Sequence, residues 1–192
     1  MLPLLQNAAE TLEKITKDDM VQLRSFLAPP LSAASVMEGM CYVFNEDQNV
    51  KAKTIDGEKV QDFWEYSKKN ILNDKLIKRV KEFKIDQVRA IPAIKIEKLK
   101  VFMLKPEFEK DRVFNASKAA GNLSLWIRAV VDTYEALLIV DPKKRLLTEA
   151  ERQLLQSELL LRQKQDALSK VLAMLQELEN NYEKARKEKE DL

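Results

Sequence analysis

The residues available for chemistry in this chain are almost all charged side chains, because the usual catalytic and metal-binding groups are nearly missing. The 192 residues include no histidine, one cysteine and three glycines. Without histidine, no Ser–His or Cys–His nucleophile pair can form and the common zinc sites lose their ligands. Three scattered glycines cannot make a phosphate-binding loop, and no G-x-x-x-x-G-K motif occurs. Carboxylate pairs exist, but nothing gathers them beside a nucleophile. We therefore expect a non-catalytic chain with no cofactor and no metal site.

The 33 basic and 31 acidic residues are unevenly distributed along the chain. Residues 1–50 carry a net charge of −4, residues 51–112 carry +6, and residues 113–192 are neutral. A basic block attracts a polyanion, which can be nucleic acid, an anionic lipid surface or an acidic protein surface. The block also contains 11 acidic residues, which suits a patterned protein surface better than a phosphate backbone.

The aromatic residues and the cysteine fall on apolar helix faces, as core residues do. Phe63, Trp64, Phe102 and Trp126 have aliphatic neighbours at helical spacing, which disfavours base-stacking platforms and hence nucleic acid. Cys41 lies on the wide apolar face of residues 36–44, where we expect a small buried side chain rather than a reactive thiol. A lone cysteine excludes an internal disulfide framework and favours a reducing compartment, the cytoplasm. No apolar run reaches the roughly 18 residues of a spanning helix and no secretory signal is visible, so we expect no membrane partner.

Short helical segments joined by proline-marked loops predict a compact helical head. Residues 4–15 are helix-like, and Thr16 followed by acidic residues predicts a capped helix over 18–27. Ser32 or Ser35 is expected to start the next helix. Residues 50–60 alternate around Asp56-Gly57, which predicts a short β-hairpin. Helices are then expected over 61–71, 74–83 and 94–104, with Ile94, Leu99, Val101 and Phe102 facing inward.

From residue 113 onwards the pattern is helical to the C-terminus, with Pro142 as the only expected interruption. Beyond that proline, apolar residues recur at steps of seven: Leu147, Leu154, Leu161, Leu168, Leu175 and Tyr182. Such a heptad repeat predicts a coiled coil. At 1.5 Å per residue, the segment would be about 75 Å long, so a single helix packed on this small head is the weaker alternative. The N-terminal helix can pair antiparallel with only a short part of it. We therefore expect the missing strand in a longer chain, or two copies pairing through this helix.

Four sequence blocks occur in a recognisable order. They are P-P-L-S-A-A-S-V-M-E-G-M-C at 29–41, F-K-I-D at 83–86 followed by the segment 94–102, S-K-A-A at 117–120 with Leu123, Trp126, Arg128 and Ala129, and V-D-P-K-K-R at 140–145 with Leu147, Ala150 and Glu151. Together they resemble the microtubule-binding domain and distal stalk of dynein heavy chains, over roughly residues 1–155. The resemblance implies an all-α fold, a small helical bundle at the tip of an antiparallel coiled coil with a short hairpin. It also places Pro3 and Pro142 at the base of the head, as stalk hinges.

The resemblance implies a microtubule-binding face and a division of the chain. Family members bind the acidic microtubule through the first tip helix, the loop before the last head helix and the start of that helix. Those places hold Lys17, Arg24, Lys110, Arg112, Asn115 and Lys118, with Lys68, Lys69 and Lys75 as second-rank candidates. Asn115 is a departure, since cytoplasmic members tend to have a basic residue there. The expected parts are an outgoing stalk helix (1–15), a head (16–125) with a flap-like insertion (45–60), and a last head helix that continues into the returning stalk helix (126–192).

The resemblance also implies a mechanism and a cellular setting. In the family, an ATPase ring elsewhere in the heavy chain slides one stalk strand against the other, which changes the affinity of the head for microtubules. Apolar doublets such as Leu146-Leu147 and Leu154-Leu155 would let the returning helix present either of two seams. The hairpin lies where axonemal members often carry a flap, which favours a ciliary or flagellar axoneme and leaves room for an axonemal light chain. The alternative is a structural protein that homodimerises through residues 143–192 and binds another acidic partner.

Overall fold

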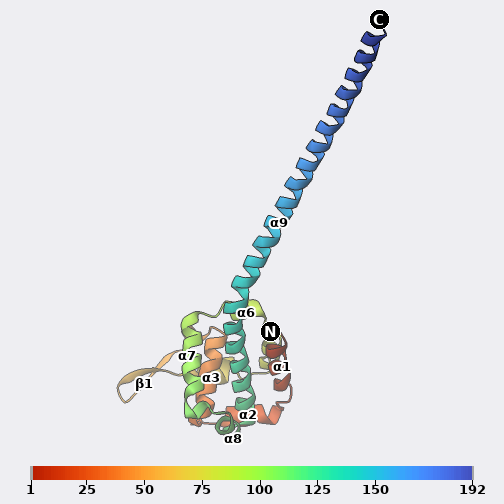
Figure 1. Ribbon diagram of the computed structural model, residues 1–192. Helices are drawn as coiled ribbons and strands as arrows, with labels where there is room; N and C mark the ends of the chain where they lie inside the picture. Colours follow the sequence, from red (N-terminus) through yellow and green to blue (C-terminus); the bar gives the residue numbers. More distant parts are fainter. Residues whose placement is uncertain (1, 192) are drawn as a thin grey trace. The chain divides into compact units, whose positions relative to one another are not determined.

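The computed structural model describes residues 2–191 and divides into two compact units, one ending at Ile139 and one beginning at Val140. The first unit, called the head below, is mainly helical (Figure 1). The elements in chain order are α1 (Leu2–Leu12), α2 (Lys17–Ser25), α3 (Leu31–Val43), the 3-10 turn η1 (Asp47–Asn49), β1 (Ala52–Ile55), β2 (Glu58–Gln61), α4 (Phe63–Asn70), α5 (Leu76–Lys81), α6 (Ile85–Arg89), α7 (Ala93–Leu104), the 3-10 turn η2 (Pro106–Phe108), α8 (Lys110–Ala116) and α9 (Lys118–Glu190). The expected helical class is confirmed.

Helix α3 is the centre of the head and contacts α4, α7, α8 and η2. Its side chains Val36, Met37, Met40 and Cys41 are fully buried. Gly39 allows this close packing, because a Cβ at that position would lie 3.1 Å from Ile127 and 3.2 Å from Leu99. The core therefore forms where the most apolar helix of the sequence is surrounded by its neighbours.

Aromatic side chains fill the space between α3, α5 and α9, as the sequence led us to expect. Trp126 is fully buried and lies 5.3 Å from Phe83 and 5.7 Å from Phe44, measured between ring centroids. Trp64 is also buried, and its indole nitrogen donates to the carbonyl of Phe26 at 3.2 Å. Phe63 and Phe102 pack half-buried against the same core. These rings serve packing and are not displayed as stacking platforms.

Two helix starts show how local chemistry fixes the element boundaries. The expected cap at Thr16 is present as a capping box, in which Thr16 Oγ1 accepts from the Asp19 amide at 3.1 Å and Asp19 accepts from the Thr16 amide at 2.8 Å. The expected start of α3 at Ser32 or Ser35 is wrong. The helix begins at Leu31, directly after Pro30, whose fixed φ of −55° with ψ of 144° ends the extended segment there.

The predicted hairpin is present and is exposed along its whole length. Strands β1 and β2 pair antiparallel, and Asp56 and Gly57 both have positive φ, 49° and 85°, as a type I′ turn requires. The residues that flank the hairpin are joined by a backbone hydrogen bond, in which the Asp62 amide donates to the Lys51 carbonyl at 3.0 Å. Lys53 and Asp62 add an ion pair at 2.7 Å. The hairpin is therefore an addition to the head that contributes nothing to its core.

Helix α7 buries a different stripe from the one predicted. Ile94 and Val101 are 66% and 55% exposed, while Ile96 and Leu99 are buried. Apolar residues occur on nearly all sides of this helix, so its sequence does not define a single apolar face. The contact with α3 therefore decides which face is buried. The prediction for Leu99 is confirmed and that for Ile94 and Val101 is wrong.

The helical pattern predicted from residue 113 onwards is interrupted at Ser117, and the interruption expected at Pro142 is wrong. Ser117 is extended, with φ of −162° and ψ of 130°, and its hydroxyl accepts from the Ala120 amide at 3.3 Å, so it ends α8 and caps α9. Pro142 lies inside α9, whose helical assignment continues past it. A proline removes one donor from a helix, and an exposed helix can tolerate that loss.

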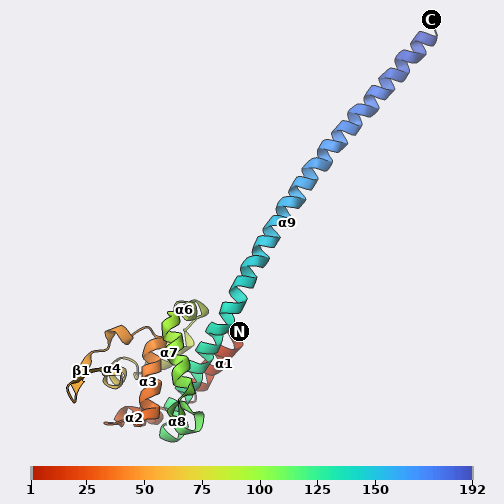
Figure 2. The same ribbon diagram turned by 60° about the vertical axis from the view of Figure 1, so that its left-hand side comes forward.

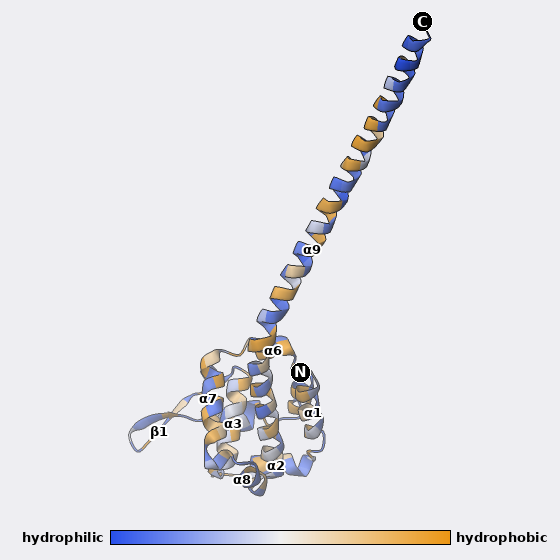
Figure 3. Ribbon diagram, viewed as in Figure 1, coloured by the Kyte–Doolittle hydropathy of each residue, from blue (hydrophilic) through white to orange (hydrophobic). Residues whose placement is uncertain are grey.

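The second unit, from Val140, is the remainder of α9, and its apolar residues are exposed. Figure 3 shows hydrophobic patches recurring along it. The seam residues Leu154, Leu161 and Leu168 are 58–60% exposed. An exposed heptad seam of this length is typical of a coiled-coil strand. Among the described residues, no helix is both long and apolar enough to span a bilayer.

Candidate functional site

Two short helices and the first turn of α9 form one end of the head. Figures 1 and 2 both show α2 and α8 next to each other at the end farthest from α6. Lys118, the first residue of α9, lies 4.0 Å from Asp19 of α2, measured between Nζ and Oδ2. We call this region, made of α2, α8 and the first turn of α9, the basic end.

The basic end displays the six residues of the implied microtubule-binding face. All six are exposed on these three elements: Lys17 and Arg24 on α2, Lys110, Arg112 and Asn115 on α8, and Lys118 on α9. Arg112 is 3.7 Å from Glu109, and Lys118 is paired with Asp19 as described. Within residues 2–191, no carboxylate lies at ion-pair distance from the side chains of Lys17, Arg24 or Lys110. Three cations at this end are thus available to an external acidic surface.

Asp19 links the capping of α2 to the charge of the basic end. The Thr16 amide donates to its carboxylate, which lowers the pKa of Asp19, and the Thr16 hydroxyl and the charge of Lys118 lower it further. The carboxylate therefore stays ionised to a lower pH than that of an aspartate without these partners. It fixes the start of α2 and the direction of the Lys118 side chain together.

The three second-rank lysines lie in different surroundings. Asp74, the residue before Lys75, lines a shallow groove together with Lys17 and Arg24 of α2. Lys68 is paired with Glu65 one turn earlier in α4. Lys69 lines a separate groove at the base of the hairpin. Of these three, only Lys75 thus has a direct chain neighbour that lines a groove with α2.

Two residues that position α8 escaped the sequence analysis. Gly121 of α9 accommodates the ring of Phe114, because a Cβ at residue 121 would lie 2.5 Å from that ring. Arg128 of α9 donates to the carbonyl of Phe108 in η2 at 2.9 Å. A glycine within an otherwise helical pattern is the one signal that could have pointed to the first contact. No local sequence signal points to the second.

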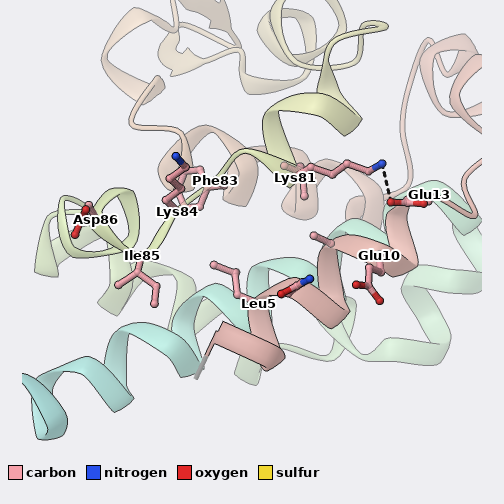
Figure 4. A pocket seen from close by; sticks show the side chains of 11 residues that line it. Leu5, Glu10, Glu13, Lys81, Phe83, Lys84, Ile85 and Asp86 are labelled. Atoms are coloured by element: carbon pink, nitrogen blue, oxygen red, sulfur yellow. Dashed lines mark ion pairs between the residues drawn. The ribbon is translucent and has the colours of Figure 1, made fainter.

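A groove lies between α1 and the segment that joins α5 to α6 (Figure 4). Leu5 of α1 faces Phe83 and Ile85 across it, and Ala9 also lines the groove. At its end, Lys81 pairs with Glu13 at 2.6 Å, measured between Nζ and Oε1. Leu5, Ala9 and Leu12 are buried in the core of the head, so α1 is held by a narrow apolar stripe, and Glu13, the residue after α1, adds the ion pair with α5.

The two proposed hinge prolines occupy different helical positions. Pro3 lies in the first turn of α1, where its missing N–H removes no helical hydrogen bond. Pro142 lies inside α9, three residues beyond the boundary between the two units. Pro3 is therefore close to the start of α1, whereas Pro142 is close to the boundary between the two units and far from either end of α9.

Cys41 is a core residue, as expected. It is fully buried, and its sulfur lies 3.4 Å from the Ser67 hydroxyl. Burial raises the pKa of the Cys41 thiol to about 12, so the reactive thiolate is scarce near neutral pH. Within the described part of the chain, no group of three or more acidic or cysteine side chains is arranged to hold a metal ion.

Comparison with known proteins identifies the family. The family model described as the microtubule-binding stalk of dynein motor matches residues 1–191. The chain belongs to this family. Among relatives, it is 28% identical to human dynein axonemal heavy chain 3 over 193 residues, which is 100% of this chain and 5% of the relative. It is 29% identical to human dynein axonemal heavy chain 6 over 177 residues, or 92% of this chain and 4% of the relative.

Cytoplasmic dynein heavy chains and a solved dynein domain match as well. The Paramecium tetraurelia cytoplasmic dynein heavy chain is 28% identical over 154 residues, or 78% of this chain and 3% of the relative. A solved structure titled microtubule-binding domain of dynein-c is similar with a TM-score of 0.57 and 26% identity, covering 74% of this chain and 90% of that chain. The protein is thus a non-catalytic microtubule-binding stalk domain of dynein, associated with the cytoskeleton, and it spans about one-twentieth of the length of the heavy chains it matches.

Proposed function

We propose that this domain is the track-binding tip of a dynein motor heavy chain, and that its basic end makes the microtubule contact. The contact residues are Lys17, Arg24, Lys110, Arg112, Asn115 and Lys118, with Lys68, Lys69 and Lys75 as second-rank candidates. The observation that carries this assignment is the clustering of three exposed cations without internal partners on α2 and α8. Each exposed ion pair is worth at most about 1 kcal/mol, so binding depends on the cluster and weakens with salt.

Charge reversal within α8 and α9 tests this face. We expect Lys110, Arg112 and Lys118 changed together to Glu to abolish co-sedimentation with microtubules, because an acidic track would then repel α8. The matched control reverses Lys164, Lys170 and Lys184, three exposed lysines of the second unit that lie outside the proposed face. Equal binding of the two triple variants, or wild-type binding unchanged between low and high salt, would refute the proposal.

We further propose that sliding of the stalk strands sets the affinity. Helix α1 is suited to axial movement because it is held by three buried side chains and one exposed ion pair, and it lines an open groove. The returning helix presents apolar doublets, such as Leu146-Leu147 and Leu160-Leu161, that offer two alternative seams. In this proposal residues 1–15 and 126–192 are the outgoing and returning stalk strands, residues 16–125 are the head with its insertion at 45–60, and Pro3 and Pro142 mark the joints. Cysteine cross-links that lock each register should give two different microtubule affinities; equal affinities would contradict the sliding.

A ciliary or flagellar axoneme is the proposed setting. Its support is the hairpin at the place of the axonemal flap and the likeness to axonemal heavy chains. A light chain of the axoneme is a proposed additional partner. Localisation of the tagged parent heavy chain in ciliated cells tests the setting, and its absence from the axoneme would contradict it.

A second candidate is a homodimer formed through the returning helix. The exposed leucine seam beyond Pro142 is the observation that favours it, since such seams pair with another helix. Analytical ultracentrifugation separates the two candidates. A concentration-independent monomer that pellets with microtubules supports the motor tip alone, while a concentration-dependent dimer shows that two returning helices pair with each other.

A further inference from the structure

Arg128 of α9 is a partly buried cation whose partners are a backbone carbonyl and an aromatic ring. Its guanidinium donates to the Phe108 carbonyl at 2.9 Å and lies 5.3 Å from the centroid of the Phe108 ring. Within residues 2–191 no carboxylate forms an ion pair with it. A half-buried cation without a carboxylate partner is costly, so contacts with a loop carbonyl and a ring must offset the loss of its hydration. The guanidinium of Arg128 therefore holds the 3-10 turn η2 in place through Phe108.

The loop that Arg128 holds leads directly into α8. Phe108 is the last residue of η2 and is fully buried. One residue, Glu109, separates it from Lys110, the first residue of α8. Glu109 makes no side-chain capping bond, and the seven-residue helix α8 ends at the extended Ser117. Such a short helix has little intrinsic stability, so its placement depends on tertiary contacts.

A second contact holds α8 at its other end. The ring of Phe114 packs against Gly121 so closely that a Cβ there would lie 2.5–2.7 Å from three ring atoms. Arg128 and Gly121 lie on the same helix, α9, about two turns apart. The first part of α9 thus fixes both the entry into α8 and its exposed face, which bears Lys110, Arg112 and Asn115.

We propose that Arg128 is a positioning residue for the microtubule contact: through Phe108 it sets the place of α8, and so the distance between the α8 cations and those of α2. This inference rests on the proposed function of the basic end. Arg128 itself need not touch the partner. Without Arg128, the α8 charges should contribute little to microtubule affinity, whereas the α2 charges should contribute as much as in the wild type.

A double-mutant cycle on microtubule affinity tests the proposal with the whole 192-residue chain. The α8 variant is Lys110→Gln with Arg112→Gln, and the α2 variant is Lys17→Gln with Arg24→Gln. Each is measured alone and combined with Arg128→Met, which removes the charge and the donor but retains an apolar side chain. Circular dichroism and thermal melting first establish that each variant is folded.

We expect the effects of Arg128→Met and of the α8 variant on microtubule affinity to be non-additive, and those of Arg128→Met and the α2 variant to be additive. In the wild-type background, removing either charge pair should weaken binding about fivefold to tenfold, as two exposed ion pairs allow. With Arg128→Met, the α8 change should weaken binding by less than about twofold, while the α2 change keeps its full effect. Arg128→Lys, which retains a charged donor near Phe108, should restore most of the coupling. Lys100→Met removes one positive charge that pairs with Glu97 and Glu135, and it should leave both effects unchanged.

Each outcome of the cycle decides between clear alternatives. If the α8 charges keep their full effect on affinity in Arg128→Met, the positioning role is overturned.

Gly121→Ala displaces α8 at its other contact while Arg128 is kept. The α8 charges should therefore lose their effect on affinity in this variant as well, and an unchanged effect would count against the proposal. This variant serves if Arg128→Met fails to fold. If wild-type binding shows no dependence on salt or on either charge pair, the proposed function fails first. Salt-sensitive binding with a fully additive cycle refutes the positioning role alone.

Discussion

Cys41 shows how burial changes the chemistry of a single residue. Its pKa is raised to about 12 because the thiolate would be desolvated in the core, whereas the thiol of the unfolded chain titrates near 9. Between these values the folded state holds a proton that the unfolded state releases. The free energy of unfolding therefore falls as the pH rises from about 9 towards 12.

This dependence predicts a difference between the wild type and Cys41→Ala. As the pH rises from 9 to 12, the wild type should lose stability relative to the variant by up to about 1.4 kcal/mol per pH unit. Urea denaturation at pH 8, 9.5 and 10.5 measures it. The raised pKa of Tyr42 adds a fall above pH 10 in both proteins, so the difference between them isolates Cys41. Parallel curves for the two proteins would contradict the assignment.

At the residue scale, the sequence predicts whether a side chain is buried or caps a helix better than it predicts which residue the side chain contacts. The helical spacing around Cys41 indicated a core position, and the Thr16 cap followed from Thr and acidic residues at fixed offsets. The contacts of Gly121 with Phe114 and of Arg128 with Phe108 join separate elements. Such pairings depend on how helices pack: the glycine at 121 indicates that something comes close, but no local pattern identifies Phe114 or Phe108 as the partner.

At the scale of elements, the hairpin is the part that can be removed with least effect on the head. Its eight strand residues are exposed, and its ends are already joined by the hydrogen bond between Asp62 and Lys51. The chain therefore needs only a tight turn between these two residues to keep the head closed.

We expect replacement of residues 52–61 by Gly-Gly to change the free energy of unfolding by less than about 1 kcal/mol, since a shorter loop gains closure entropy and loses only one surface ion pair and the exposed hydrogen bond from Gln61 to the Asp47 carbonyl. Thermal and urea denaturation measure the change. Lys53→Ala in the intact protein isolates the contribution of the lost ion pair with Asp62. A loss of several kcal/mol would show that the hairpin does support the core.

The helices themselves were largely predictable, but their limits and faces were less so. Strong local signals, such as the Thr16 cap and the Asp56-Gly57 turn, gave correct features. Helix α7 is apolar nearly all round, so only its packing on α3 decides which side is buried. The break at Ser117 replaces the expected break at Pro142, because a hydroxyl that caps the next helix can compete with helix continuation.

At the scale of the whole molecule, the division after Ile139 separates a unit with a core from one without. Leu137 is the last buried side chain among the described residues, and every position from 142 to 191 is exposed. The heptad repeat predicted this behaviour. The strand that covers the seam could not be derived, because the repeat specifies a kind of partner and not its identity.

A protein that ends at Ile139 should therefore keep the stability of the head. We expect its melting temperature to stay within about 3 °C of that of the full chain, because a change below about 0.5 kcal/mol shifts the midpoint of a domain of this size by only a few degrees. Differential scanning calorimetry measures it. The same truncation with Leu137→Ala, which opens the core, is the destabilised control. A loss of cooperative melting on truncation alone would show that the second unit supports the head.

The aromatic cluster of Phe44, Phe83 and Trp126 gives the head a built-in optical reporter. Trp126 is fully enclosed, and its indole nitrogen has no acceptor among the described residues, so its fluorescence should be emitted at short wavelength. Trp64 is the second tryptophan, and Trp64→Phe would leave a single emitter. Because Trp126 belongs to α9 and Phe83 lines the groove beside α1, a red shift on track binding would record, in real time, whether these two helices repack together.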